Sequence, residues 1–156
     1  MDAAWEGASL DKILSGHSIL ESNRVTVDGC EILLKPRAAQ QFAMIVHELA
    51  TNALKYGALS SPDDGRISIS GKIVKADGSG SFIFSWKESG GPRVSPPTRK
   101  GFGSVILLDA AHQFGTPTMD YLPDGLLYQL ELDLKEIEVP NNVVNLSNHP
   151  TLIRAD

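Results

Sequence analysis

Residues 47–57 read His-Glu-Leu-Ala-Thr-Asn-Ala-Leu-Lys-Tyr-Gly, and they close a longer segment, 37–56, whose composition and apolar period predict a helix. Side chains three or four positions apart share one face of a helix. Four apolar residues at this spacing form a stripe that we expect to face a sheet: Phe42, Ile45, Leu49 and Ala53. Pro36 suits the first turn of this helix, and Gly57 suits its C-terminal cap. The segment therefore predicts one long amphipathic helix at the centre of the fold.

A polar stripe lies next to the apolar one on the same predicted helix. It consists of Glu48, Asn52 and Lys55, which are spaced by four and then three positions. A carboxylate, an amide oxygen and an ammonium group in this order suit a hydrated Mg²⁺ ion bound to phosphates. Mixed polar residues also occur on the solvent edge of many ordinary helices, so the stripe alone leaves both interpretations open. A zinc-protease motif is excluded, because Thr51 stands four positions after His47, where a second histidine would be needed.

Shorter periodic segments surround this helix. They predict a short helix capped by Ser9, a further helix at 104–114, and six strands at 24–27, 31–34, 66–75, 81–87, 116–122 and 126–134. We expect the first two strands to form a hairpin around Asp28-Gly29, and the next two to form a hairpin around the turn at 77–80. We also expect Ile67, Ile69 and Ile73 to share one side of their strand. This order predicts an α+β fold, a two-layer α/β sandwich in which helices cover one face of a mostly antiparallel mixed sheet.

The length and composition are those of one ordinary globular domain. We place this domain at residues 1–135 of the 156-residue chain, with a C-terminal tail or linker at 136–156. The net charge is −5 and the Lys and Arg residues are scattered, which argues against a dedicated nucleic-acid-binding protein. No apolar run approaches the roughly 20 residues that cross a bilayer, and the single cysteine, Cys30, fits a reducing compartment. We therefore expect a cytoplasmic domain without direct membrane contact.

A carboxylate and two glycines follow each other at the end of a predicted strand. Glu88 stands at the end of the strand predicted at 81–87, and Ser89-Gly90-Gly91 comes directly after it. Such a carboxylate can accept a hydrogen bond from an exocyclic amine, and glycine lets the backbone approach a flat ring. A plain turn from strand to loop explains the segment equally well, so both interpretations stay open at this point.

A second glycine segment, Gly101-Phe102-Gly103, opens the predicted helix at 104–114. The free N–H groups and the dipole at a helix start suit an anion. Arg93, Arg99 and Lys100 precede it, in a loop rich in glycine and proline, and can meet phosphate. The chain contains neither a P-loop nor the dinucleotide-binding fingerprint, so neither of these phosphate-binding motifs is expected.

In this order, the three segments resemble the ATP-binding boxes of the Bergerat-fold (GHKL) ATPases. More narrowly, they resemble bacterial sensor histidine kinases of the HWE family, which is named for a histidine in the first box and Trp-x-Glu in the second. Residues 47–60 resemble the family's N box, Trp86-Lys87-Glu88 matches Trp-x-Glu, and residues 96–104 also resemble family sequence. The resemblance extends over residues 5–134.

The resemblance implies that the chain is a Mg-ATP-binding catalytic domain. Asn52 would bind Mg²⁺, and Glu48 and Lys55 would be the catalytic residues. Lys55 would bind an ATP phosphate, while Glu48 would arrange the water shell of the metal or polarise the reaction. Glu88 would accept a hydrogen bond from the adenine amino group, and residues 93–100 would form the ATP lid. Further residues would line the nucleotide pocket: Tyr56, Gly90, Arg99, Lys100, Gly101, Gly103 and Ser104.

The resemblance also implies partners. Family kinases transfer the γ-phosphoryl group of ATP to a histidine on upstream dimerisation helices, and an aspartate of a response regulator receives it next. We expect those helices to be absent from this chain, with residues 1–14 as the linker from them. Two other functions remain as alternatives: a non-catalytic interaction module on the same fold, and a protein serine kinase of the anti-sigma type. The Trp-x-Glu segment favours the histidine kinase over the serine kinase.

Overall fold

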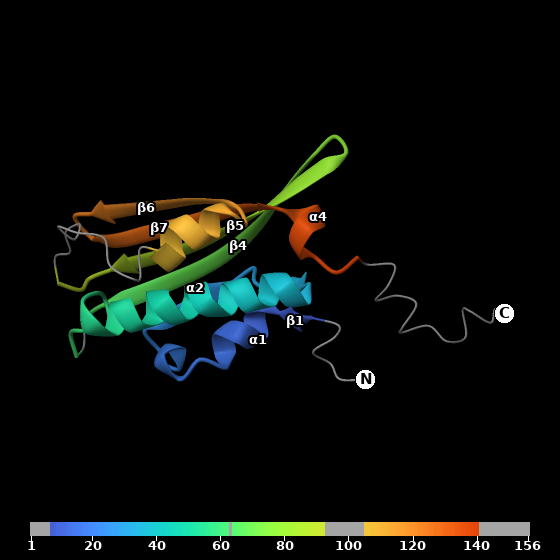
Figure 1. Ribbon diagram of the computed structural model, residues 1–156. Coiled ribbons are helices and arrows are strands. Elements are labelled where there is room, and N and C mark those ends of the chain that lie inside the picture. The colour runs from blue at the N-terminus through green and yellow to red at the C-terminus, as the bar shows by residue number, and fades with distance from the viewer. Residues whose placement is uncertain (1–6, 63, 93–104, 141–156) are drawn as a thin grey trace.

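The computed structural model describes residues 7–62, 64–92 and 105–140. They form a five-stranded sheet packed on one face against helices, which confirms the predicted two-layer α+β fold (Figure 1). The strands are ordered across the sheet as β2 (Val25–Asp28), β4 (Arg66–Ala76), β5 (Ser79–Ser89), β7 (Gly125–Asp133) and β6 (Thr116–Leu122). β2 pairs with β4 in parallel, and the other neighbours are antiparallel.

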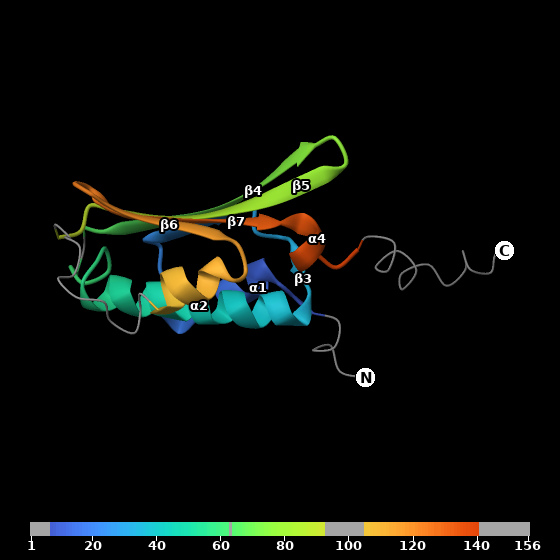
Figure 2. The ribbon, with the colours of Figure 1, turned by 45° about the horizontal axis from the view of Figure 1, so that its top comes forward.

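The helices all lie on the same side of this sheet, as Figure 2 shows. The longest is α2 (Pro36–Lys55), which runs across the sheet, with α1 (Leu10–Ser15) beside it. Shorter elements complete the layer: the 3-10 turn η2 (Ser18–Leu20), the π-helical segment η3 (Val105–Ala110) and α4 (Leu134–Ile137). A small antiparallel pair joins β1 (Ala8–Ser9) to β3 (Leu33–Leu34). No helix within the described ranges is long and apolar enough to cross a membrane.

Local sequence signals explain the bounds of the two N-terminal helices. Ser9 caps α1 as predicted, because its hydroxyl oxygen accepts a hydrogen bond from the Lys12 N–H at 3.1 Å. Pro36 occupies the first turn of α2, where its missing N–H costs nothing. Tyr56 is the C-terminal cap of α2, and its N–H and that of Gly57 both donate to the carbonyl of Asn52. Gly57 does not adopt the left-handed conformation of a glycine cap, so its predicted role there is wrong.

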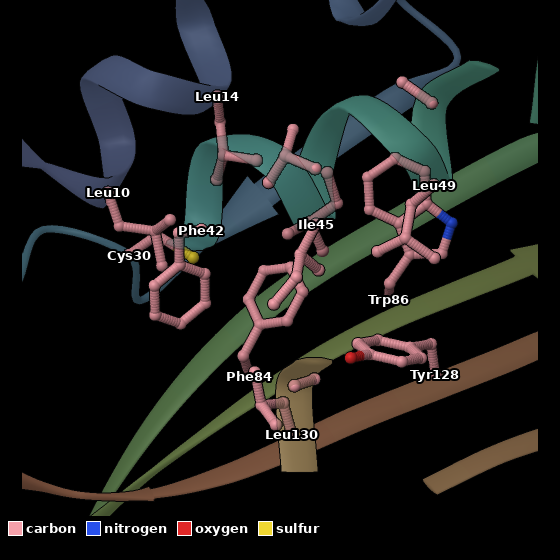
Figure 3. Packing of buried hydrophobic residues seen from close by; sticks show 14 of the residues in the cluster. Leu10, Leu14, Cys30, Phe42, Ile45, Leu49, Phe84, Trp86, Tyr128 and Leu130 are labelled. Carbon is pink, nitrogen blue, oxygen red and sulfur yellow. The ribbon is translucent and has the colours of Figure 1, made fainter. Parts of the chain in front are cut away.

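The core forms where the apolar stripe of α2 meets the inner face of the sheet (Figure 3). The predicted stripe is confirmed, since all four of its side chains are at most 1% exposed: Phe42, Ile45, Leu49 and Ala53. The ring of Phe42 meets Phe82, Phe84 and Phe114 edge-on, at centroid distances of 6.4, 5.4 and 5.6 Å. Burial of this stripe fixes α2 across the sheet and leaves its neighbouring face at the rim.

The predicted hairpin around Asp28-Gly29 is wrong. β2 pairs in parallel with β4, while β3 pairs with β1. Gly29 is in the left-handed region (φ 75°), and a Cβ there would lie 2.1 Å from the Gly71 carbonyl oxygen, so the chain turns away while packed against β4. The alternate residues Cys30, Ile32 and Leu34 are then all buried. The local turn signal predicted that the chain would reverse direction here. The chain instead continues to β3, and this course buries the three side chains.

The structure differs in detail from the sequence-based expectation at three further places. Ile67 and Ile69 are buried as predicted, but Ile73 is 47% exposed because the β4–β5 hairpin projects beyond the helices (Figure 2). The helix expected at 104–114 is a π-helical segment from Val105, followed by two helical residues that end at His112. Ordered contacts also extend past residue 135, since Ile137 is fully buried and the Val139 N–H donates to the Leu33 carbonyl at 2.9 Å.

Replacement of Phe42 tests the weight of the helix–sheet contact. Phe42→Ala should lower the free energy of unfolding by about 3–5 kcal/mol, because it removes a fully buried ring and leaves a cavity. Met44→Ala on the same helix is the matched control, since Met44 is 49% exposed and its loss should cost less than roughly 0.5 kcal/mol. Urea unfolding of both variants measures the difference, and equal costs would contradict this packing.

Candidate functional site

The polar stripe of α2 lies beside the buried stripe, as the spacing requires. Glu48 and Asn52 are half-buried and Lys55 is exposed, so the three side chains follow the rim between the core and solvent. Thr51, which lies between them in sequence, directs its hydroxyl to the helix backbone, at 3.0 Å from the His47 carbonyl oxygen and 3.2 Å from that of Glu48. A carboxylate, an amide oxygen and an ammonium group on one helix edge are a donor set that fits Mg²⁺ with phosphate.

Glu88 is the one buried charged side chain among the described residues, with 3% of its surface exposed. Its Oε1 accepts a hydrogen bond from the Ala58 N–H at 2.9 Å, and its Oε2 accepts one from the Trp86 indole N–H at 2.9 Å. Burial raises the pKa of Glu88, and these two hydrogen bonds act in the opposite direction because they favour the carboxylate. The carboxyl group is therefore fixed in position by groups from β5 and from the loop that follows α2.

Four glycines allow close backbone packing at Glu88 and in the segments beside it. A Cβ on Gly57 would lie 2.2 Å from Glu88 Oε1, and a Cβ on Gly125 would lie 2.2 Å from the Glu88 carbonyl oxygen. Beyond the strand, Gly90 adopts φ 73°, and a Cβ there would lie 2.6 Å from the Asp64 carbonyl oxygen. A Cβ on Gly91 would lie 2.7 Å from the Ala58 Cα. The loop after α2 and the segment after β5 are therefore packed directly against each other.

Two residues near Glu88 were not found by sequence reasoning. Arg24 binds four carbonyl groups of the loop after α2 through its guanidinium group. Tyr121 on β6 lies close enough to Glu88 that the carboxylate charge, in addition to burial, raises the pKa of the tyrosine hydroxyl. A lone arginine before a strand and a tyrosine within one carry no local signal of a site, so only the fold reveals them.

His47, the histidine of the first box, contacts a second histidine. Its Nδ1 lies 3.2 Å from Nε2 of His17, and the two ring centroids are 5.4 Å apart. Burial lowers the pKa of His17, and the positive charge that His47 would carry lowers it further. Nδ1 of His17 is buried and has no hydrogen-bond partner in the part of the chain that the structure describes. The pair ties the start of the polar stripe to the segment after α1.

The remaining predicted site residues lie outside the described residues. These are Arg93, Arg99, Lys100, Gly101, Gly103 and Ser104, together with the predicted lid at 93–100. Tyr56 and Gly90 are described and exposed, Tyr56 at the end of α2 and Gly90 after β5. The structure thus brings the loop after α2, Glu88 and Gly90 together at one end of the sandwich.

Curated proteins similar to this chain are blue-light-activated histidine kinases. The protein from Brucella anthropi is 32% identical over 129 residues, which cover 79% of this chain and 26% of the relative. The protein from Brucella ovis is 37% identical over 107 residues, which cover 66% of this chain and 22% of the relative. The chain therefore spans about a quarter of the length of these relatives. No family model matches the sequence.

Solved structures show the same fold. The histidine kinase domain of the Erythrobacter litoralis protein EL346, a blue-light-activated histidine kinase, matches with a TM-score of 0.64 and 18% identity, over 81% of this chain and 64% of that one. The Acinetobacter baumannii histidine kinase AdeS matches with a TM-score of 0.53 and 14% identity, over 79% and 61%. The chain thus resembles the catalytic domains of blue-light-activated, HWE-type histidine kinases in sequence and has the fold of histidine kinase catalytic domains.

Removal of the indole donor tests what holds Glu88. Trp86→Phe should raise the pKa of Glu88 further, because the Nε1 hydrogen bond favours the carboxylate. A carboxyl whose folded pKa is raised contributes stability that is present below its unfolded pKa and lost as pH rises through its folded pKa. That loss of stability should therefore extend to higher pH in the variant. An NMR titration of the Glu88 side-chain carboxyl carbon measures the shift.

Tyr128→Phe is the matched control for this titration. Tyr128 is also fully buried, but its hydroxyl donates to the Leu107 carbonyl oxygen at 2.8 Å and not to Glu88. Replacement of Tyr128 by Phe should leave the pKa of Glu88 unchanged. A Glu88 pKa that stays the same or falls in Trp86→Phe would show that the indole does not stabilise the carboxylate.

Proposed function

We propose that the chain binds Mg-ATP and acts as the catalytic domain of a two-component sensor histidine kinase. The phosphoryl group of ATP would pass to a histidine on dimerisation helices of the parent kinase that lie upstream of this chain, and then to a response regulator. The observation that carries the proposal is the buried, doubly hydrogen-bonded carboxylate of Glu88 next to the end of α2. The sequence similarity to histidine kinases supports it.

Glu88 is proposed to accept a hydrogen bond from the adenine amino group. Each carboxylate oxygen has two lone pairs, and each accepts one hydrogen bond from the protein, so both keep capacity for a further donor. The carboxylate cannot turn toward another partner without losing the Ala58 or the Trp86 donor. A fixed acceptor of this kind suits selection between bases, because a base without the matching donor leaves it unpaired.

The edge of α2 is proposed to hold the metal and the phosphates. Asn52 would supply an amide oxygen to Mg²⁺, Glu48 would orient water molecules of the metal, and Lys55 would neutralise phosphate charge. Ala58, which donates to Glu88, follows Lys55 by three residues, so the two parts of the proposed site belong to the same end of the sandwich. When bound, Mg-ATP supplies the transferable phosphoryl group, and the protein contributes position and electrostatic stabilisation.

Further residues are proposed to contact the two ends of the nucleotide. Tyr56, 68% exposed beside Lys55, and Gly90 would contact it from the described part of the chain. Five residues outside the described ranges would complete the phosphate end: Arg99, Lys100, Gly101, Gly103 and Ser104. Binding of Mg-ATP without phosphorylation of the upstream helices would instead identify a non-catalytic interaction module on the same fold.

Asn52→Ala tests the metal site. The variant should bind Mg-ATP more weakly by about 1.5–3 kcal/mol, because it loses a charge-assisted contact to the metal. Leu54→Ala is the matched control, since Leu54 is 50% exposed on the same turn of α2 and has no proposed role. Titration calorimetry of both variants with Mg-ATP measures the affinities. An Asn52→Ala affinity equal to that of the control would remove Asn52 from the site.

The choice between ATP and GTP tests the role of Glu88. GTP presents an acceptor where adenine carries its amino group, so its binding would place two acceptors opposite each other. We expect ATP to bind more tightly by about 1–3 kcal/mol, or roughly five- to more than a hundredfold. Calorimetry with both nucleotides in the presence of Mg²⁺ measures the ratio, and equal affinities would rule out base recognition by Glu88.

A further inference from the structure

Arg24 gathers four carbonyl groups of one loop onto a single guanidinium group. Its Nε donates to the Gly65 carbonyl at 2.9 Å, and its Nη1 donates to that of Pro62 at 3.1 Å. Its Nη2 donates to the carbonyls of Ala58 and Ser61, at 2.8 and 2.7 Å. The loop that follows α2 is therefore wrapped around one positive charge. Arg24 has no part in the nucleotide contacts proposed above.

We propose that Arg24 is a positioning residue for the nucleotide site, which it shapes through Ala58. The inference rests on the proposed function in one respect, namely that Glu88 reads the base. Ala58 is held through both of its backbone groups: its carbonyl accepts from Arg24 Nη2, and its N–H donates to Glu88 Oε1 at 2.9 Å. The guanidinium group thus determines where the Ala58 N–H lies, and that N–H determines where the carboxylate lies.

The backbone of Arg24 is anchored to the same part of the sheet as Glu88. The Arg24 carbonyl accepts a hydrogen bond from the Ile67 N–H at 2.9 Å. In the sheet, Val25 is in register with Ile67, and Ile67 is in register with Glu88. Arg24 therefore precedes by one residue the cross-strand row that ends at the carboxylate. The β2–β4 and β4–β5 pairings thus connect Arg24, which binds the loop, to Glu88, which the loop positions.

A guanidinium group is suited to this task, and an ammonium group is not. Arginine presents five donors in a planar fork, and carbonyl oxygens that converge on one point repel each other without a cation between them. Lysine carries three donors on one nitrogen and cannot span four separated carbonyls. The loop is also limited from the other side, because Gly91 packs against the Ala58 Cα. A displaced loop would consequently disturb both Glu88 and the glycine segment after it.

Arg24→Lys and Arg24→Gln, made in the full chain, test the proposal. Hydrogen exchange of the Ala58 amide should accelerate roughly tenfold or more in both, because its bond to Glu88 loses its support. The exchange rate of the Phe84 amide in the sheet should change far less, since Arg24 lies outside the hydrophobic cluster. Arg37→Lys is the matched control, because Arg37 is exposed on α2, and it should change neither amide.

The ratio of ATP to GTP affinity is the second readout. Loss of the clamp should reduce the preference for ATP by roughly fivefold or more, because a mobile carboxylate discriminates less between the two bases. A purely structural role would slow or speed all amides together and leave this ratio unchanged, and that result would overturn the proposal. Unchanged Ala58 exchange in both Arg24 variants would overturn it as well.

Failure of the proposed function gives a different result. If the wild-type chain bound neither nucleotide, the base-reading role of Glu88 would be lost. The exchange of Ala58, which is measured without nucleotide, would still decide whether Arg24 positions the loop and its carboxylate partner. Faster Ala58 exchange in both variants would support the positioning role, and unchanged exchange would refute it.

Discussion

Burial of one stripe of α2 against the sheet is the constraint on which the rest of the structure depends. Phe42, Ile45 and Leu49 are almost completely removed from water, and Phe42 meets two rings of β5, so the helix has one permitted rotation over the sheet. The neighbouring polar face is thereby held at the rim. A site built on such a face inherits the rigidity of the core, because any rotation that moved Asn52 would also expose Phe42 or Leu49.

At the end of the same helix, the core contains a carboxyl group. A carboxyl group as buried as Glu88 is costly to ionise, and the Ala58 and Trp86 donors offset part of that cost. Gly57 and Gly125 are necessary there for a steric reason, since any larger residue would displace the carboxyl or its backbone. The Trp-x-Glu motif has a simple physical meaning in this fold, because alternate residues of one strand face the same side and the indole can donate to the carboxylate.

Much of this could be predicted from sequence, for reasons that differ between elements. The helical period of residues 37–56 and the alternation on either side of Asp77-Gly78 are local, and both elements have the predicted form. The hairpin predicted at 24–34 failed because β2 pairs in parallel with a strand that lies beyond α2, and turn residues cannot report such a partner. The role of Arg24 could not be predicted for the same reason, since its carbonyl partners lie 34 to 41 positions away in the sequence. The polar stripe and Glu88 were found because their spacing and order resemble a known family.

The parallel pairing of β2 with β4 has a consequence for the order of folding. β4 and β5 are joined by a two-residue turn, whereas β2 meets β4 only after the chain has closed a long loop that contains α2. Closing such a loop costs more entropy, so the hairpin has a kinetic advantage over the parallel pair. Arg24 reaches the loop after α2 only when β2 has docked. We therefore expect the clamp around Ala58 to form late in folding, so that a chain that has acquired its helix and its hairpin still lacks a fixed loop beside Glu88.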